Sequence, residues 1–137
     1  MMDWKQCNDN KMVKKVSEDL ELIKSLKISS NKSFQSAGRL KLDNITATSV
    51  ISLYYDSLRE VLEALAISKG YKVYNHECYC AFLKEIIKDE DIGNNFDKFR
   101  KIRNKIKYYG KDISSEDAKD IIQELKETIK GIQQFIK

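Results

Sequence analysis

The stretch NITATSVISLYYDSLREVLEALAISK, residues 44–69, decides the fold class. Its apolar side chains recur every three or four residues over about seven turns, which is the pattern of an α-helix with one buried face. Gly70 follows directly, and glycine readily adopts the left-handed conformation that ends a helix. A helix this long and this apolar must be covered by other helices, so the stretch predicts a helical bundle.

The composition supports this fold class. The chain of 137 residues has no proline and only five glycines, so it has few of the residues that build the turns of a β protein. Its length corresponds to a single domain, residues 1–137. We therefore expect an all-α, up-and-down bundle of four long helices plus a short one.

The remaining segments follow from periodicity and capping residues. Residues 9–26 and 75–89 predict helices, the second with Asn75 as its N-cap. The serine-rich residues 29–43 predict a mobile connection that contains a short helix. Residues 91–95 predict a turn. A basic helix ending at Gly110 follows it, and a last helix begins after a staple and cap at Ile113 and Ser114.

The basic helix lies within FDKFRKIRNKIKYYGK, residues 96–111. This stretch has seven lysines and arginines and one acid, Asp97, so it carries +6, whereas the whole chain carries +4. Helical spacing predicts that an apolar side of the helix faces the core, namely Phe96, Phe99, Ile102, Ile106 and Tyr109. A strip of donors follows the edge of that side, made of Arg100, Arg103, Asn104 and Lys107. Such a strip is suited to binding an anion, although a solvated basic face is the alternative.

Several other residues leave two interpretations open. Tyr55, Asp56 and Arg59 are either ordinary surface residues of the long helix or part of a cleft, and Arg59 is spaced to pair with Glu63. The segment H-x-C-x-C, which contains His76, Cys78 and Cys80, lacks the spacing of a zinc site, so we expect helix-start and core packing there and no metal or other cofactor.

The cysteines and the apolar runs bear on location. Three cysteines cannot all pair, and the sequence lacks a secreted disulfide framework, so we expect reduced thiols in the cytoplasm. The N-terminal residues have no signal-peptide core, and no apolar run is long enough to cross a bilayer. The expectation is a cytoplasmic protein that does not enter a membrane.

The segment FRKIRNKIKYYGK, in the last third of a short helical chain, resembles the signature helix of HEPN domains. The similarity extends to the long tyrosine-containing helix before it, its glycine stop, the Asn-His pair that opens the next helix, and the final amphipathic helix. This resemblance implies a helical bundle that forms a two-fold dimer. In nuclease members, an arginine, a polar residue and a histidine four to six positions later line the dimer cleft and cut RNA without metal.

Carried over to this chain, Arg103 matches the motif arginine and Asn104 the polar residue. The histidine has no match, because Tyr108, Tyr109 and Gly110 occupy the positions where it belongs. A phenol with an ordinary pKa of about 10 is a poor base at neutral pH. An arginine alone still stabilises a phosphate, and tyrosine rings stack on bases.

Three hypotheses follow. The first is a homodimer that binds RNA or a nucleotide without efficient cleavage, through Arg100, Arg103, Asn104, Lys107, Tyr108 and Tyr109. The second is a toxin-like, metal-independent endoribonuclease that uses Arg103 with Tyr108 or His76. The third is a protein-interaction module that partners a nucleotidyltransferase in a toxin–antitoxin pair. Because the basic helix contains no evident acidic complement, we also expect anions to stabilise the dimer.

Overall fold

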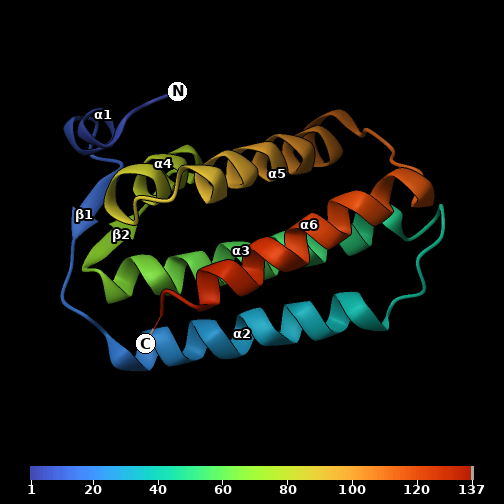
Figure 1. The fold of residues 1–137 in the computed structure, drawn as a ribbon, viewed down its shortest axis with the longest axis horizontal. Coiled ribbons are helices and arrows are strands. Elements are labelled where there is room, and N and C mark those ends of the chain that lie inside the picture. Colours follow the sequence, from blue (N-terminus) through green and yellow to red (C-terminus); the bar gives the residue numbers. More distant parts are fainter. Residues whose placement is uncertain (137) are drawn as a thin grey trace.

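The computed structural model describes residues 1–136 and is an all-α bundle of four long helices with short elements at one end (Figure 1). The long helices alternate in direction along the bundle, which confirms the predicted up-and-down arrangement. They are α2 (Leu20–Arg39), α3 (Ala47–Ser68), α5 (Glu90–Tyr109) and α6 (Ser115–Gln133).

Helix α3 is the centre of the bundle. Fourteen of its residues are buried, including Leu58, Leu62 and Leu65, which have no exposed surface. Helices α2, α5 and α6 all pack against it (Figure 1). This position explains why residues 44–69 carry so strong an apolar pattern. Gly70 ends the segment with φ +87°, as predicted.

The short elements gather beside the C-terminal end of α3. They are α1 (Trp4–Asp9), the strands β1 (Val13–Lys15) and β2 (Tyr71–Val73), α4 (His76–Ala81) and the π-helix η1 (Phe82–Ile86). The strands form an antiparallel pair in which Val13 faces Val73. The Asn75 side chain accepts a hydrogen bond from Glu77 N at 2.8 Å, so the predicted N-cap is confirmed.

The predicted helix over residues 9–26 is wrong over residues 10–19, whereas residues 20–26 are helical, as the start of α2. Its apolar repeat is divided between two elements, because Val13 belongs to β1 and Ile23 to α2. Lys11, with φ +58°, interrupts any helix before the strand, and the Asp19 side chain caps α2 by accepting from Leu22 N at 3.0 Å. A periodic apolar pattern thus arose from residues that occupy different elements.

The predicted connection over residues 29–43 is also wrong, because α2 continues through it to Arg39. Its serines pack α2 closely onto α3: Ser30 Oγ donates to Ser57 O at 2.7 Å, and Ser57 Oγ donates to Ser30 O at 2.8 Å. Both serines are buried. Small polar residues that suggested a loop therefore make a close helix–helix contact.

The segments around α4 and α5 differ from the prediction in two ways. The helix expected over 75–89 ends as η1, and Lys88 follows with φ +65°. Residues 91–95 are not a turn but the first turns of α5, which the Asp89 side chain caps through Ile92 N at 3.0 Å. The predicted stops and caps at Gly110 and Ser114 are confirmed.

The thiols are not all reduced, contrary to the expectation. Cys7 and Cys78 form a disulfide, and Cys80 is a buried free thiol. The bond joins α1 to α4 across 71 positions of sequence, a pairing that spacing alone did not suggest. Among residues 1–136, no helix combines the length and the apolar character needed to cross a membrane.

Gly93 offers a test of how tightly α4 and α5 pack. A Cβ at this position would lie 2.6 Å from Lys84 Cγ and 3.3 Å from the Cys80 carbonyl oxygen. We expect Gly93→Ala to lower the free energy of unfolding by about 1–2 kcal/mol, since overpacking outweighs the gain in helix propensity. Urea denaturation measures the effect.

Gly131→Ala in α6 is the matched control, because its Cβ would meet only Ile92 Cδ1, at an ordinary 3.4 Å. That variant should raise the free energy of unfolding by about 0.5–1 kcal/mol. Equal stabilisation by the two substitutions would show that α4 and α5 do not pack as described.

Candidate anion-binding site

Helix α3 is covered on almost every side, and the residues of one stripe reach solvent only in part. The stripe consists of Ser52, Leu53, Asp56, Arg59 and Glu63. Their spacing of one, three or four residues places them on a single side of the helix. Helices α2, α5 and α6 all contact α3, and this stripe is the part of α3 that they leave partly exposed.

Arg59 does not pair with Glu63, although their spacing permits it. The Glu63 carboxylate instead lies 2.9 Å from Lys72 Nζ on β2. No carboxylate lies within 4 Å of the Arg59 guanidinium among residues 1–136. Because Lys72 of β2 pairs with Glu63, Arg59 is a half-buried cation of the stripe without a carboxylate partner in this part of the chain.

On α5, Asp97 holds Arg100 in place. The carboxylate accepts from Arg100 Nη2 at 2.8 Å and Nε at 3.2 Å, and Lys101 Nζ lies 3.0 Å away. Burial opposes ionisation of Asp97, but the hydrogen bonds and charges of Arg100 and Lys101 outweigh it and lower the pKa of the carboxyl. Arg100 is thereby fixed on α4's side of α5, where the Cys80 thiol donates to the same carboxylate at 3.6 Å.

The basic helix is thus less uniformly positive than its sequence indicates. Lys98 pairs with Glu124 of α6, in addition to the two cations on Asp97. Asp97 within the helix and Glu124 of α6 thus compensate three of its cations. Arg103 has no carboxylate within 4 Å in the described part of the chain. Its guanidinium carbon lies 5.6 Å from the centroid of the Tyr55 ring on α3.

Tyr55 connects this arginine to the only histidine of the chain. The Tyr55 hydroxyl lies 3.1 Å from His76 Nδ1, at the first residue of α4. Three helices therefore bring four side chains near one another, namely Arg59 of α3, His76 of α4, and Arg100 and Arg103 of α5, since the charges of all three arginines act on the imidazole. We call these four residues the Arg–His cluster.

The cluster favours a neutral imidazole. Burial lowers the pKa of His76, and the positive charges of Arg59, Arg103 and Arg100 lower it further, against a smaller opposite effect of Glu63. Burial also raises the pKa of Tyr55 to about 12, so its hydroxyl keeps its proton at neutral pH. The hydrogen bond between them is therefore one between a neutral phenol and a neutral imidazole.

The direction of that bond follows from burial. Tyr55 is 1% exposed, and in residues 1–136 its hydroxyl has no hydrogen-bond partner other than His76 Nδ1. A buried donor without an acceptor costs about 1–3 kcal/mol. We infer that the hydroxyl donates to Nδ1 and that the imidazole proton resides on Nε2. Nε2, the imidazole nitrogen that Tyr55 does not contact, then carries an N–H donor. The three guanidinium groups of the cluster are donors as well.

The other predicted binding residues lie apart from the cluster or beside it. Asn104 is half-buried next to Arg103 on α5, and Lys107 follows one turn later and is exposed. Tyr108 and Tyr109 are 64% and 82% exposed, so Tyr109 is not part of the apolar side as predicted. Five residues turn an α-helix by about 140°, so Tyr108 points away from Arg103 and is not placed to act with it.

The H-x-C-x-C segment has a structural explanation for its cysteines and a site for its histidine. Cys78 is oxidised to a disulfide and Cys80 donates to Asp97, whereas His76 joins the Arg–His cluster. Sequence reasoning ranked the α5 residues above Arg59 and His76. In the sequence, His76 is marked by its place after the N-cap Asn75, but its contact with Tyr55 of α3 is tertiary and has no signal there.

No protein-family model matches the sequence, and a search of curated proteins finds no match.

The first prediction of this geometry concerns charge. Arg59→Gln should raise the pKa of His76, because it removes a nearby positive charge that opposes protonation. The imidazole proton signals in a ¹H NMR pH titration measure this directly, because the chain has one histidine. Arg39→Gln, at the exposed end of α2, is the charge-matched control and should leave that pKa unchanged. An equal pKa in both variants would place Arg59 far from the imidazole.

The second prediction concerns stability. The pKa of His76 is lowered in the folded state, whereas the unfolded chain has an ordinary value of about 6.5. The unfolded state therefore binds more protons as the pH falls below about 6.5, and the free energy of unfolding decreases there. Denaturation of wild type and His76→Gln between about pH 7.5 and 5.5 tests this. The variant should lose less stability over that range, and a steeper loss would contradict the neutral imidazole.

Proposed function

We propose that this protein binds the phosphates of single-stranded RNA or of a nucleotide at the Arg–His cluster, and that it does not cleave them efficiently. Arg103 and Asn104 form the part of this site on α5, and Lys107 extends it by one turn. The proposal retains the HEPN-like character indicated by the sequence, including a cytoplasmic homodimer. Two-fold packing would place two such clusters near one groove.

The observation that carries the proposal is that every group of the cluster donates. Arg59 and Arg103 have no carboxylate within 4 Å in residues 1–136, and the Nε2–H of His76 is the nitrogen not engaged by Tyr55. Guanidinium groups bind phosphate oxygens through paired N–H donors, and an imidazole N–H adds a further donor. A site of donors held at the meeting of three helices is suited to an oxyanion.

The same feature argues against efficient cleavage. Attack by a 2′-hydroxyl requires a group that accepts its proton near neutral pH. His76 supplies such an acceptor only after its tautomer is exchanged, which breaks the hydrogen bond from the buried Tyr55. Tyr108 is exposed and points away from Arg103, so it does not replace the missing base.

Cleavage remains the second candidate because one observation favours it. His76 and Arg103 both contact Tyr55, and this shared contact with a histidine supports a nuclease in which His76 acts with Arg103. Incubation with labelled RNA in the presence of EDTA distinguishes the two candidates. The RNA stays intact if the protein only binds it, and it is cut if the protein is a metal-independent nuclease.

Fluorescence anisotropy with a labelled oligouridylate tests the binding proposal. Arg103→Gln should weaken binding about tenfold or more, since a charged hydrogen bond to phosphate contributes about 1.5–3 kcal/mol. Lys130→Gln, which removes an exposed charge on α6, is the matched control and should change the affinity little. Wild-type affinity should fall with salt, by about 0.7 log units per log unit of salt for each phosphate contacted.

The outcomes separate the alternatives. An affinity that is independent of salt, or equal losses in Arg103→Gln and Lys130→Gln, would contradict phosphate binding at the cluster. Cleavage that is lost in His76→Ala would replace the binding proposal with the nuclease. In that case Tyr55→Phe should cleave RNA faster than wild type. Without the phenol hydroxyl, the imidazole proton can move to Nδ1, and Nε2 is then free to accept a proton.

A further inference from the structure

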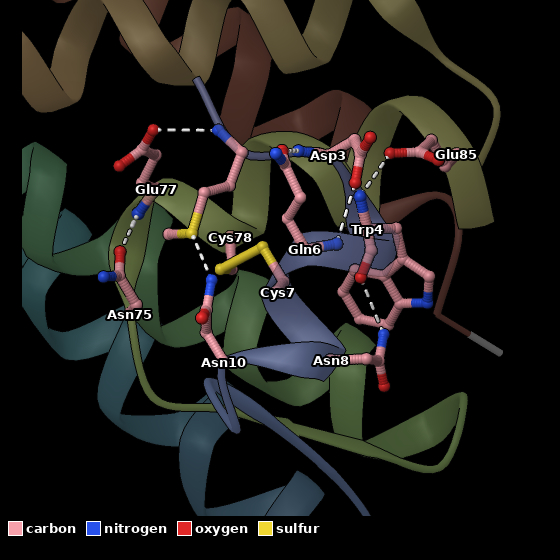
Figure 2. The surroundings of a disulfide bond; sticks show 11 residues. Asp3, Trp4, Gln6, Cys7, Asn8, Asn10, Asn75, Glu77, Cys78 and Glu85 are labelled. Carbon is pink, nitrogen blue, oxygen red and sulfur yellow. Dashed lines mark hydrogen bonds between the residues drawn. A yellow bond between two sulfur atoms is a disulfide. The ribbon is translucent and has the colours of Figure 1, made fainter.

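The N-terminal segment is attached to the helix that carries His76 by several contacts at once (Figure 2). Cys7 of α1 is bonded to Cys78 of α4, and both residues have no exposed surface. Met2 N donates to Glu77 Oε1 at 3.1 Å. Trp4 N donates to Glu85 Oε2 at 2.6 Å, and the Trp4 ring packs against Phe82 with centroids 5.9 Å apart.

Neither α1 nor α4 is stable by itself. Each has six residues, and helices shorter than about 12 residues are marginal in water without tertiary contacts. Helix α4 continues directly into the π-helix η1, whose wider turns are uncommon and locally less favourable. The orientation of α4, and of the imidazole at its first residue, therefore depends on the contacts of α4 with α5 and with α1.

The disulfide lies between the two halves of the candidate site. Two residues before Cys78 is His76, and two residues after it is Cys80, whose thiol donates to the carboxylate that fixes Arg100. A displacement of α4 at Cys78 would thus alter the imidazole and the Asp97–Arg100 pair together. It would also separate His76 from Tyr55, which belongs to α3 and has no covalent link to α4.

We propose that the Cys7–Cys78 disulfide is a redox latch that sets the phosphate affinity of the Arg–His cluster, the oxidised form being the tighter binder. A dithiol reduces the bond to two thiols, and its own two sulfurs become a disulfide, so two electrons and two protons pass to Cys7 and Cys78. The inference rests on the proposed phosphate binding for its effect, but the change in α4 can be observed separately.

The burial of both cysteines adds a condition. A reductant reaches the sulfurs only when α1 lifts from α4, because neither residue is exposed while α1 is docked. The main-chain hydrogen bonds of Met2 and Trp4 to Glu77 and Glu85 oppose that opening. Reduction should therefore be slow in wild type and faster in Glu85→Ala, which removes the acceptor of Trp4 N.

The test compares the full chain before and after treatment with dithiothreitol, at a temperature where far-UV circular dichroism shows the bundle intact. Alkylation in denaturant followed by mass measurement counts one thiol in the oxidised protein and three in the reduced protein. Reduction should weaken binding of labelled oligouridylate by about fivefold or more, the lower range of coupling between linked sites. It should also shift the His76 imidazole signal and change its pKa.

Two variants control the test. Cys7→Ser should have the reduced protein's affinity and His76 signal, and dithiothreitol should then change neither. In Arg103→Gln, RNA binding is weakened but reduction should still move the His76 signal, which separates the latch from the proposed function. Should Cys7→Ser fail to fold, Glu85→Ala supplies the second comparison through its faster reduction.

Two outcomes would contradict the latch, and a third would remove only its effect on phosphate binding. Three thiols in protein prepared under oxidising conditions would show that the bond does not form. An identical His76 signal and identical RNA affinity in the oxidised and reduced chain would show that the bond is structural only. If wild type binds no RNA in either state but the His76 signal moves on reduction, phosphate binding fails and the coupling between the disulfide and α4 stands.

Discussion

The hydrogen bond between the buried Tyr55 hydroxyl and His76 Nδ1 is the interaction on which the candidate site depends. It joins the central helix to α4, which carries the only histidine, and it determines which imidazole nitrogen holds the proton. Arg103 lies over the same tyrosine ring, and thus the bond also relates the histidine to the basic helix. Tyr55 is therefore the residue through which the imidazole and Arg103 are held near each other.

The fold follows from one requirement, which is that α3 be covered along nearly its whole length. That requirement is visible in the sequence, so the helical class, the length of α3 and the stop at Gly70 were predictable from periodicity. The extent of α2 was not. Serines predict a loop when only local preferences are considered, but Ser30 and Ser57 exchange hydrogen bonds that exist only once the two helices are packed.

The site was predictable to the same limited degree. A local excess of charge identified Arg100 and Arg103, because net charge within one helix is a property of sequence. Their compensation was not visible, since the partner of Lys98 is Glu124 on another helix and the partner of Glu63 is Lys72 on a strand. Those pairings decide which cations remain available, and Arg59 is one of them only because β2 takes Glu63. The Cys7–Cys78 bond likewise depends on a tertiary contact across 71 positions.

The most direct measurement of the central claim is a long-range ¹H–¹⁵N NMR correlation of the His76 ring at neutral pH in uniformly labelled protein. We predict a proton on Nε2 and none on Nδ1 in wild type, and a mixture of both tautomers in Tyr55→Phe. A proton on Nδ1 in wild type would contradict this claim, because His76 would then donate to Tyr55 and present a free acceptor beside Arg103, which is the arrangement of a base rather than of a phosphate-binding donor.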